Sequence, residues 1–242
     1  MAIVSNVKCQ MSSVKCLMLD VKCQMSNVKC RYMRRSIVLL FIFLSSSFTL
    51  HSQGISDVFT SMPDSIFPLL TSKNRHDMVD FYKNKMEAKV RNRLGDYALL
   101  DTLTEDYLKL IPSKSSTIEM KLMETDDSVT VVCLIQTVKA PVPDSSVKFY
   151  DSEWRRLHWL ELPIAETTDF FNEIPDSVAE EMKFVQKSID DLRLIAVSVS
   201  PDEPVFTMQL AVDELAKEEK KIAERHLVTV RYRWTGRDFV KE

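Results

Sequence analysis

Alternating apolar and polar residues mark the first half of the chain as rich in strands. Turn-forming residues at 126–127 and 141–144 separate segments of strand length. The predicted strands are residues 107–111, 117–123, 129–138 and 147–150. In the second of these, Glu119 and Lys121 lie on the face opposite the apolar residues. The third is apolar on both faces, which is typical of a central, buried strand.

Apolar residues spaced three and four apart predict helices in three places. The first helix takes Asn74 as its N-cap and fades near Val90. The others span residues 178–189 and 213–225, an irregular lead-in is expected at 62–70, and the aromatic-rich segment 154–162 is not assigned to helix or strand. Alternation returns in predicted strands at 192–200, 205–212 and 227–234, followed by a short strand that contains Phe239 and Val240.

These elements together predict an α+β fold. We expect a mostly antiparallel sheet of about seven or eight strands with helices on one side. Residues 53–165 and 166–242 also share short fragments in the same order, such as Leu108–Ile111 with Leu192–Ile195. The chain could therefore contain two duplicated α/β-hairpin lobes, or amphipathic strands could look alike by composition alone.

Residues 5–32 follow a different pattern, a near-perfect heptapeptide repeat. Cysteine recurs every seven residues within it, at positions 9, 16, 23 and 30. A coiled coil would need acidic partners at flanking positions, and a zinc site would need cysteines two to four residues apart. The repeat has neither, so we interpret it as a translated DNA repeat upstream of a true start at Met33.

The segment from Met33 to Ser52 has the layout of a secretory signal peptide. Arg34 and Arg35 precede an apolar run that is too short for a membrane span, and small and polar residues follow it. We expect cleavage after Ser52 or Gln53, and an exported protein that is periplasmic, secreted or on the cell surface. No stable membrane span is expected in the mature chain.

The composition of residues 53–242 limits the possible partners and chemistry. Removing the seven basic residues and one acidic residue of positions 1–52 leaves 25 basic and 34 acidic residues, a net charge of −9. Nucleic acid is therefore not an expected partner. Cys133 is then the only cysteine, which excludes an internal disulfide, and three glycines in the whole chain offer no phosphate-binding loop.

Catalytic and metal-binding patterns are not apparent in the sequence. The histidines are isolated, no serine elbow is present, and Cys133 lies in the most hydrophobic segment, where a thiol is inert. No cofactor or metal is therefore predicted. Asp151 with Glu153, or Asp169, could form a glycosidase-like acidic pair, although such pairs are expected by chance in an acidic chain.

Aromatic and arginine residues form the best candidate for a binding surface. They gather in 149–159 and again around residue 234. Exposed tryptophan and arginine are common at binding sites, whereas buried ones would close the sheet. The candidate binding patch consists of Tyr150, Trp154, Arg155, Trp159, Arg231, Arg233 and Trp234.

Several segments of the chain resemble a known protein family. They are residues 63–70, 74–82, 103–108 and 136–141. The sequence is similar there to a family of secreted proteins of unknown function from Bacteroides-type bacteria of the order Bacteroidales. The resemblance extends over nearly all of residues 53–242. It implies a compartment and a lineage, supplies no catalytic residues, and does not include the repeat at 5–32.

Three functions follow as hypotheses. The first is a non-enzymatic binding or interaction module of the cell envelope, with a protein or a glycan as its partner. The second is a hydrolase that uses a dispersed acidic pair. The third is a structural accessory subunit of an envelope complex. Exposed tryptophans on a sheet face would favour the first, and two carboxylates across a deep cleft would favour the second.

Overall fold

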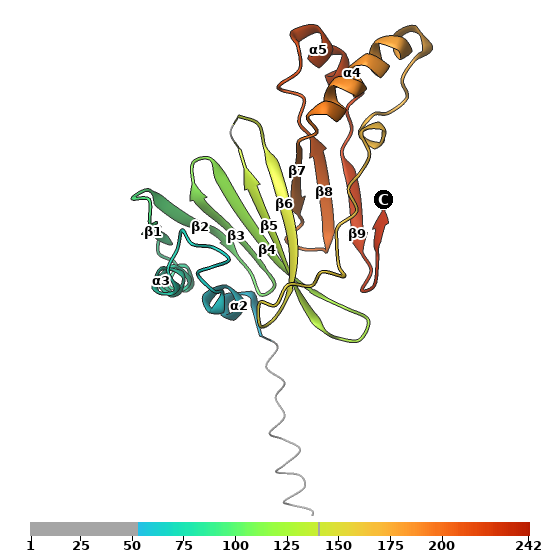
Figure 1. The fold of residues 1–242 in the computed structure, drawn as a ribbon. Coiled ribbons are helices and arrows are strands. Elements are labelled where there is room, and N and C mark those ends of the chain that lie inside the picture. The colour runs from blue at the N-terminus through green and yellow to red at the C-terminus, as the bar shows by residue number, and fades with distance from the viewer. Residues whose placement is uncertain (1–52, 140) are drawn as a thin grey trace, which may run out of the picture. The chain divides into compact units, whose positions relative to one another are not determined.

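Two antiparallel sheets carry the fold (Figure 1). The structure is a computed structural model that describes residues 53–242, apart from residue 140. The repeat predicted for residues 1–32 and the signal peptide predicted for 33–52 lie outside the described residues. The helices are α2 (Ile55–Ser61), α3 (Ser72–Lys83), α4 (Ala179–Asp191) and α5 (Lys217–His226), with 3₁₀ turns at Thr167–Phe170 and Asp176–Val178.

The first sheet is a meander of six strands in chain order. The strands are β1 (Lys89–Arg91), β2 (Tyr97–Leu103), β3 (Tyr107–Ser113), β4 (Ser116–Glu124), β5 (Thr130–Val138) and β6 (Asp144–Asp151). The register pairs Lys121 with Cys133 and Cys133 with Phe149. Most residues of β5 are buried on both faces, as the continuous apolar run predicts.

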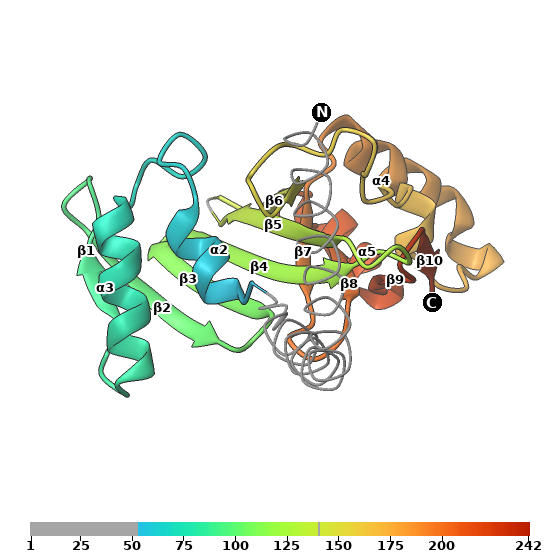
Figure 2. The same ribbon diagram turned by 90° about the horizontal axis from the view of Figure 1, so that it is seen from below.

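Helices α2 and α3 cover one face of this sheet (Figure 2). Phe59 of α2 and Met78 of α3 are fully buried against apolar residues of β3, β4 and β5, such as Met120 and Leu134. The amphipathic pattern of α3 and the even-numbered apolar residues of β4 therefore form one core. Burial of this kind contributes about 25 cal/mol per Å² of apolar surface removed from water.

The second sheet packs against the other face of the first. Its order is β10 (Phe239–Lys241), β9 (Val230–Trp234), β8 (Val205–Leu210) and β7 (Ile195–Val199). Val197 and Phe206 of this sheet share a core with Cys133 and Phe149 of the first sheet. Helices α4 and α5 add Met182 and Ala223 to that core. The opposite face of β9, with Arg231 and Arg233, is the more exposed one.

The edge strand β7 is held by side chains of the first sheet. The Val197 N–H donates to Ser145 Oγ at 2.9 Å, and the Val199 N–H donates to Glu119 Oε2 at 3.0 Å. Lys121 Nζ donates to the Pro201 carbonyl at 2.5 Å. Polar side chains thus satisfy an edge whose N–H groups would otherwise lie unpaired in a protein interior.

The predicted α+β class with mostly antiparallel strands is confirmed, and its arrangement is more divided than we expected. The ten strands of the described residues form two sheets instead of one of seven or eight strands. Helices α2 and α3 lie on one face of the first sheet, whereas α4 and α5 complete the core of the second. Among residues 53–139 and 141–242, no helix is long and apolar enough to cross a membrane.

The prediction for α3 was wrong at both ends. Its N-cap is Thr71, whose side chain accepts a hydrogen bond from the Asn74 N–H in a capping box. The helix ends at Lys83, and Lys85 then takes a positive φ of 57°. Val90, predicted as the end of the helix, lies in β1.

Candidate functional site

A cleft between β6 and β7 has the size of a ligand pocket. Its volume is about 410 Å³, within the range of small-ligand pockets. The third wall is the irregular segment after β6, which packs Leu162 into the core. The lining residues are Asp144, Ser145, Val147, Arg156, Glu161, Leu162, Ile164, Arg193, Ile195, Val197 and Met208.

The strand pattern places apolar residues on the floor of the cleft. Val197 pairs with Met208 across β7 and β8, and both side chains are buried. Leu162 is buried beside them, whereas Ile164, two residues later in the same segment, is 71% exposed. An apolar floor therefore continues into an exposed apolar residue at the rim.

Charges of both signs surround this floor. Asp144 accepts a hydrogen bond from the Ile195 N–H at 3.2 Å, so it positions β7. Arg156 lies over the Tyr150 ring at 5.6 Å and donates to the Phe149 carbonyl. Glu161 and Arg193 are exposed, and no ion pair among the described residues includes either of them. These two charges can therefore meet a ligand.

Two charged residues of β4, Glu119 and Lys121, lie buried between the sheets, under β7. Burial raises the pKa of Glu119, although the Val199 N–H and Lys109 oppose that rise. Burial, followed by the charge of Glu119, also raises the pKa values of Tyr107 and Cys133. Lys121 is 2% exposed and pairs with Asp106 at 2.7 Å. A fully buried thiol with a raised pKa is unreactive, as expected for Cys133.

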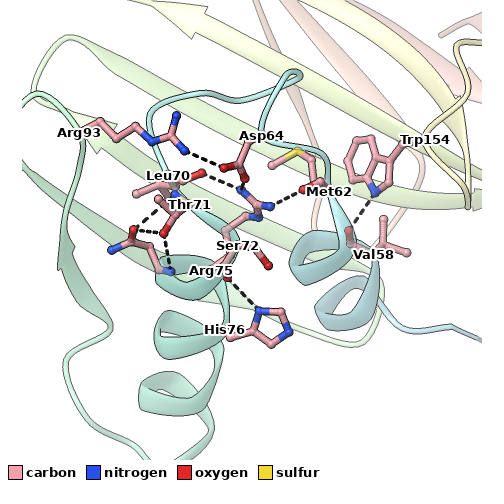
Figure 3. A network of polar contacts seen from close by, with 11 residues as sticks. Val58, Met62, Asp64, Leu70, Thr71, Ser72, Arg75, His76, Arg93 and Trp154 are labelled. Atoms are coloured by element: carbon pink, nitrogen blue, oxygen red, sulfur yellow. Dashed lines mark hydrogen bonds and ion pairs between the residues drawn. The ribbon is translucent and has the colours of Figure 1, made fainter.

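Tyr150 and Trp154 of the predicted patch lie in the core between the first sheet and helices α2 and α3. Tyr150 and Trp154 are 8% and 7% exposed, and their ring centroids are 5.4 Å apart. Trp154 has a φ of 64°, and its Nε1–H donates to the Val58 carbonyl of α2 at 3.1 Å (Figure 3). These two residues therefore join the turn after β6 to the helix layer.

The other five patch residues have different surroundings. Trp159 is 67% exposed and lies next to the buried Leu160 in the irregular segment after β6. Arg155 is exposed and paired with Asp151 and Glu153. Trp234 is buried, and its Nε1–H donates to the Glu124 carbonyl. Arg231 and Arg233 both pair with Glu242.

The acidic residues considered for hydrolysis are each tied to a cation. Asp151 and Glu153 share Arg155, at 2.6 Å and 3.0 Å. Partial burial acts to raise the pKa of Asp151, but hydrogen bonds from Arg155 and two backbone N–H groups lower it overall. The hydrogen bond from Lys241 lowers the pKa of Asp169. A general acid in a glycosidase needs the opposite shift.

The family follows from a comparison with known protein families. Residues 47–239 match the family described as "Protein of unknown function (DUF3256)". The chain belongs to this family. No curated protein matches the chain.

A solved structure from a bacterium is similar in fold and in sequence. It is described as "Structure of a domain of an uncharacterized protein from Porphyromonas gingivalis W83". The two chains are 25% identical with a TM-score of 0.63, and the match covers 78% of this chain and 97% of that one. The family match agrees with the resemblance to a family of unknown function, and the similar structure comes from Porphyromonas gingivalis, a member of the Bacteroidales.

Sequence reasoning identified only part of the cleft. It singled out 149–159, and Arg156 of that stretch lines the cavity. It missed Glu161 and Ile164, which stand in a segment without a regular period, and Arg193, which lies in the predicted strand 192–200. Leu162-Pro163-Ile164 gave one usable signal, because apolar residues around a proline in an irregular segment indicate a packed loop.

Proposed function

We propose that this DUF3256 protein is an exported, non-enzymatic binding module of the cell envelope. Its partner, a protein or a glycan, occupies the cleft between β6 and β7. The observation that carries the proposal is the cleft itself. It combines an apolar floor of Leu162 and Met208 with two charges, Glu161 and Arg193, that have no ion-pair partner among the described residues.

The surroundings of the cleft support binding over catalysis. The carboxylates considered for hydrolysis lie in ion pairs, and Glu119, whose pKa is raised, is occupied by the Val199 N–H under β7. The signal-peptide pattern of residues 33–52 and the net charge of −9 for residues 53–242 support an exported protein that does not bind nucleic acid.

Affinity capture with two matched variants tests the proposal. Protein produced from the full chain is immobilised and incubated with cell envelope extract. Ile164→Asp places a charge on the rim of the cleft, and Leu94→Asp places the same charge at another exposed aliphatic residue, which is 77% exposed. We expect Ile164→Asp to abolish capture of a specific protein or glycan and Leu94→Asp to retain it. Equal loss in both variants, or no specific partner with wild type, would contradict the proposal.

A further inference from the structure

The outer edge of β6 is only partly covered. On its inner side β6 pairs with β5 along its whole length. On its outer side only its last residues pair, with the segment that follows the turn. There the Leu157 N–H donates to the Phe149 carbonyl at 2.9 Å, and the Asp151 N–H donates to the Arg155 carbonyl at 3.0 Å. The chain then turns away, as the contact from the Leu160 N–H to the Leu157 carbonyl indicates.

The backbone groups of two residues remain unpaired at this edge. Successive residues of an antiparallel strand direct their N–H and C=O groups to alternate sides. Since Phe149 presents its carbonyl to the outer side, Val147 and Ser145 present theirs there too. Within the part of the chain that the structure describes, the backbone N–H and C=O of Val147 and Ser145 have no hydrogen-bond partner outside the sheet. Both residues line the cleft.

On the opposite wall of the cleft, backbone N–H groups of β7 are hydrogen-bonded to side chains. Strand β7 is also an edge, but Asp144 and Ser145 accept hydrogen bonds from the Ile195 and Val197 N–H groups. Proteins usually block exposed strand edges because these edges pair with other chains. Here one edge is blocked by side chains, and the facing edge of β6 is open inside a cavity.

The side chains around this edge suit a peptide better than a sugar. Sugar sites commonly offer an aromatic ring, and no lining residue of the cleft is aromatic. An extended peptide would direct alternate side chains toward the apolar floor at Leu162 and Met208 and away from it. Glu161 and Arg193 could then pair with residues of opposite charge on the peptide.

We propose that the cleft binds an extended peptide, which pairs with β6 at Ser145 and Val147 as an added strand. The peptide carries an apolar side chain for the floor and charged residues of both signs beside it. Main-chain hydrogen bonds supply affinity in this mode, and alternate side chains supply specificity. This inference rests on the proposed function of the cleft and names its ligand.

A displayed library of random nine-residue peptides tests this inference. Peptides selected by protein produced from the full chain are synthesised in forms N-methylated at single backbone amides. N-methylation removes one N–H donor and leaves the side chain in place. We expect methylation at amides of one parity to weaken binding at least tenfold and methylation at the other parity to change it little. Affinities that do not depend on the methylated position would overturn the inference.

Variants of the protein test the same contact from the other side. Val147→Pro removes an outward N–H, and because that group does not face β5 an edge strand can accept the proline. We expect it to abolish peptide binding, whereas Ser146→Ala on the same strand keeps wild-type affinity. Circular dichroism and thermal unfolding show whether Val147→Pro folds. If it does not, the N-methyl series on the wild-type protein decides.

The outcomes separate this inference from the proposed function. If the library gives no binder and Ile164→Asp still abolishes capture of a glycan from envelope extract, the binding module stands and the peptide is wrong. If Val147→Pro is folded and binds selected peptides as wild type does, strand addition is wrong. If neither the library nor the extract gives a ligand of the cleft, both proposals fail.

Discussion

At the scale of single residues, Glu119 is a carboxylate placed where its charge is disfavoured. Burial raises its pKa above the unfolded value of about 4.3. The folded state therefore holds more protons than the unfolded state between these two pKa values. The stabilising contribution of Glu119 is present below the unfolded pKa and is lost as pH rises through the folded pKa.

Glu119→Gln should remove this pH dependence. The glutamine carbonyl can still accept the hydrogen bond from the Val199 N–H, so the fold is retained. We expect the unfolding free energy of wild type, relative to the variant, to fall as pH rises above the unfolded pKa of about 4.3. Urea unfolding at several pH values measures it, with Glu214→Gln on the surface as a control. A difference that is constant over this range would contradict the prediction.

Arg75 is a second residue whose sequence gives little sign of its surroundings. It is 1% exposed, and its guanidinium donates to the carbonyls of Met62 and Leu70 and to Asp64 (Figure 3). Arg75→Ala would leave these acceptors without their donor and should cost about 3 kcal/mol. Arg93→Ala removes an exposed ion pair with the same Asp64 and should cost less than about 1 kcal/mol. Chemical denaturation measures the loss of unfolding free energy in both variants. Similar losses would show that the buried Arg75 contributes no more than the exposed Arg93.

At the scale of elements, α3 depends on its first turn. Thr71 accepts from the Asn74 N–H at 3.1 Å, and Asn74 Oδ1 accepts from the Thr71 N–H. Thr71→Ala should therefore destabilise the protein by about 1 kcal/mol, while Thr71→Ser keeps the cap and most of the stability. The midpoint of urea unfolding measures both. An alanine variant as stable as wild type would mean that packing of Met78 alone holds the helix.

The sequence predicted elements where the local pattern was strong. The strands β3 to β9 and the helix α4 follow from alternation and from helical spacing, because each has one face or both faces in a core. Helix α2 and strand β2 were missed. The first is only 7 residues long, and the second, Tyr97–Leu103, places adjacent leucines where alternation would need a polar residue. Their places are set by tertiary contacts that short windows do not contain.

At the scale of the whole molecule, the sequence could not predict what covers each sheet face. Alternation put Glu119 and Lys121 on a polar face of β4, which would ordinarily meet water. That face instead meets the edge of β7, and the two side chains bind its backbone and the turn after it. The cleft has the same origin. Its walls come from β6 and from β7, which are separated by more than forty residues of chain.

The side-chain contacts along β7 predict how the second sheet is anchored to the first. Ser145 Oγ accepts from the Val197 N–H at 2.9 Å, and the Thr137 hydroxyl contacts it at 2.8 Å. Ser145→Ala should leave the Val197 N–H without a partner and open β7 locally. We expect amide exchange at Val197 to accelerate about fivefold, which corresponds to the net free energy of one hydrogen bond of about 1 kcal/mol.

Amide exchange followed by NMR resolves this effect residue by residue. The N–H groups of Ala196 and Ser198 face β8, so they serve as internal controls and should keep their wild-type rates. Ser146→Ala, whose side chain lies on the opposite face of the same strand, should change none of these rates. If Val197, Ala196 and Ser198 accelerate together in Ser145→Ala, the second sheet opens as one unit. Anchoring of β7 by separate side chains of the first sheet would then be wrong, because loss of one acceptor side chain should expose only the N–H that donates to it.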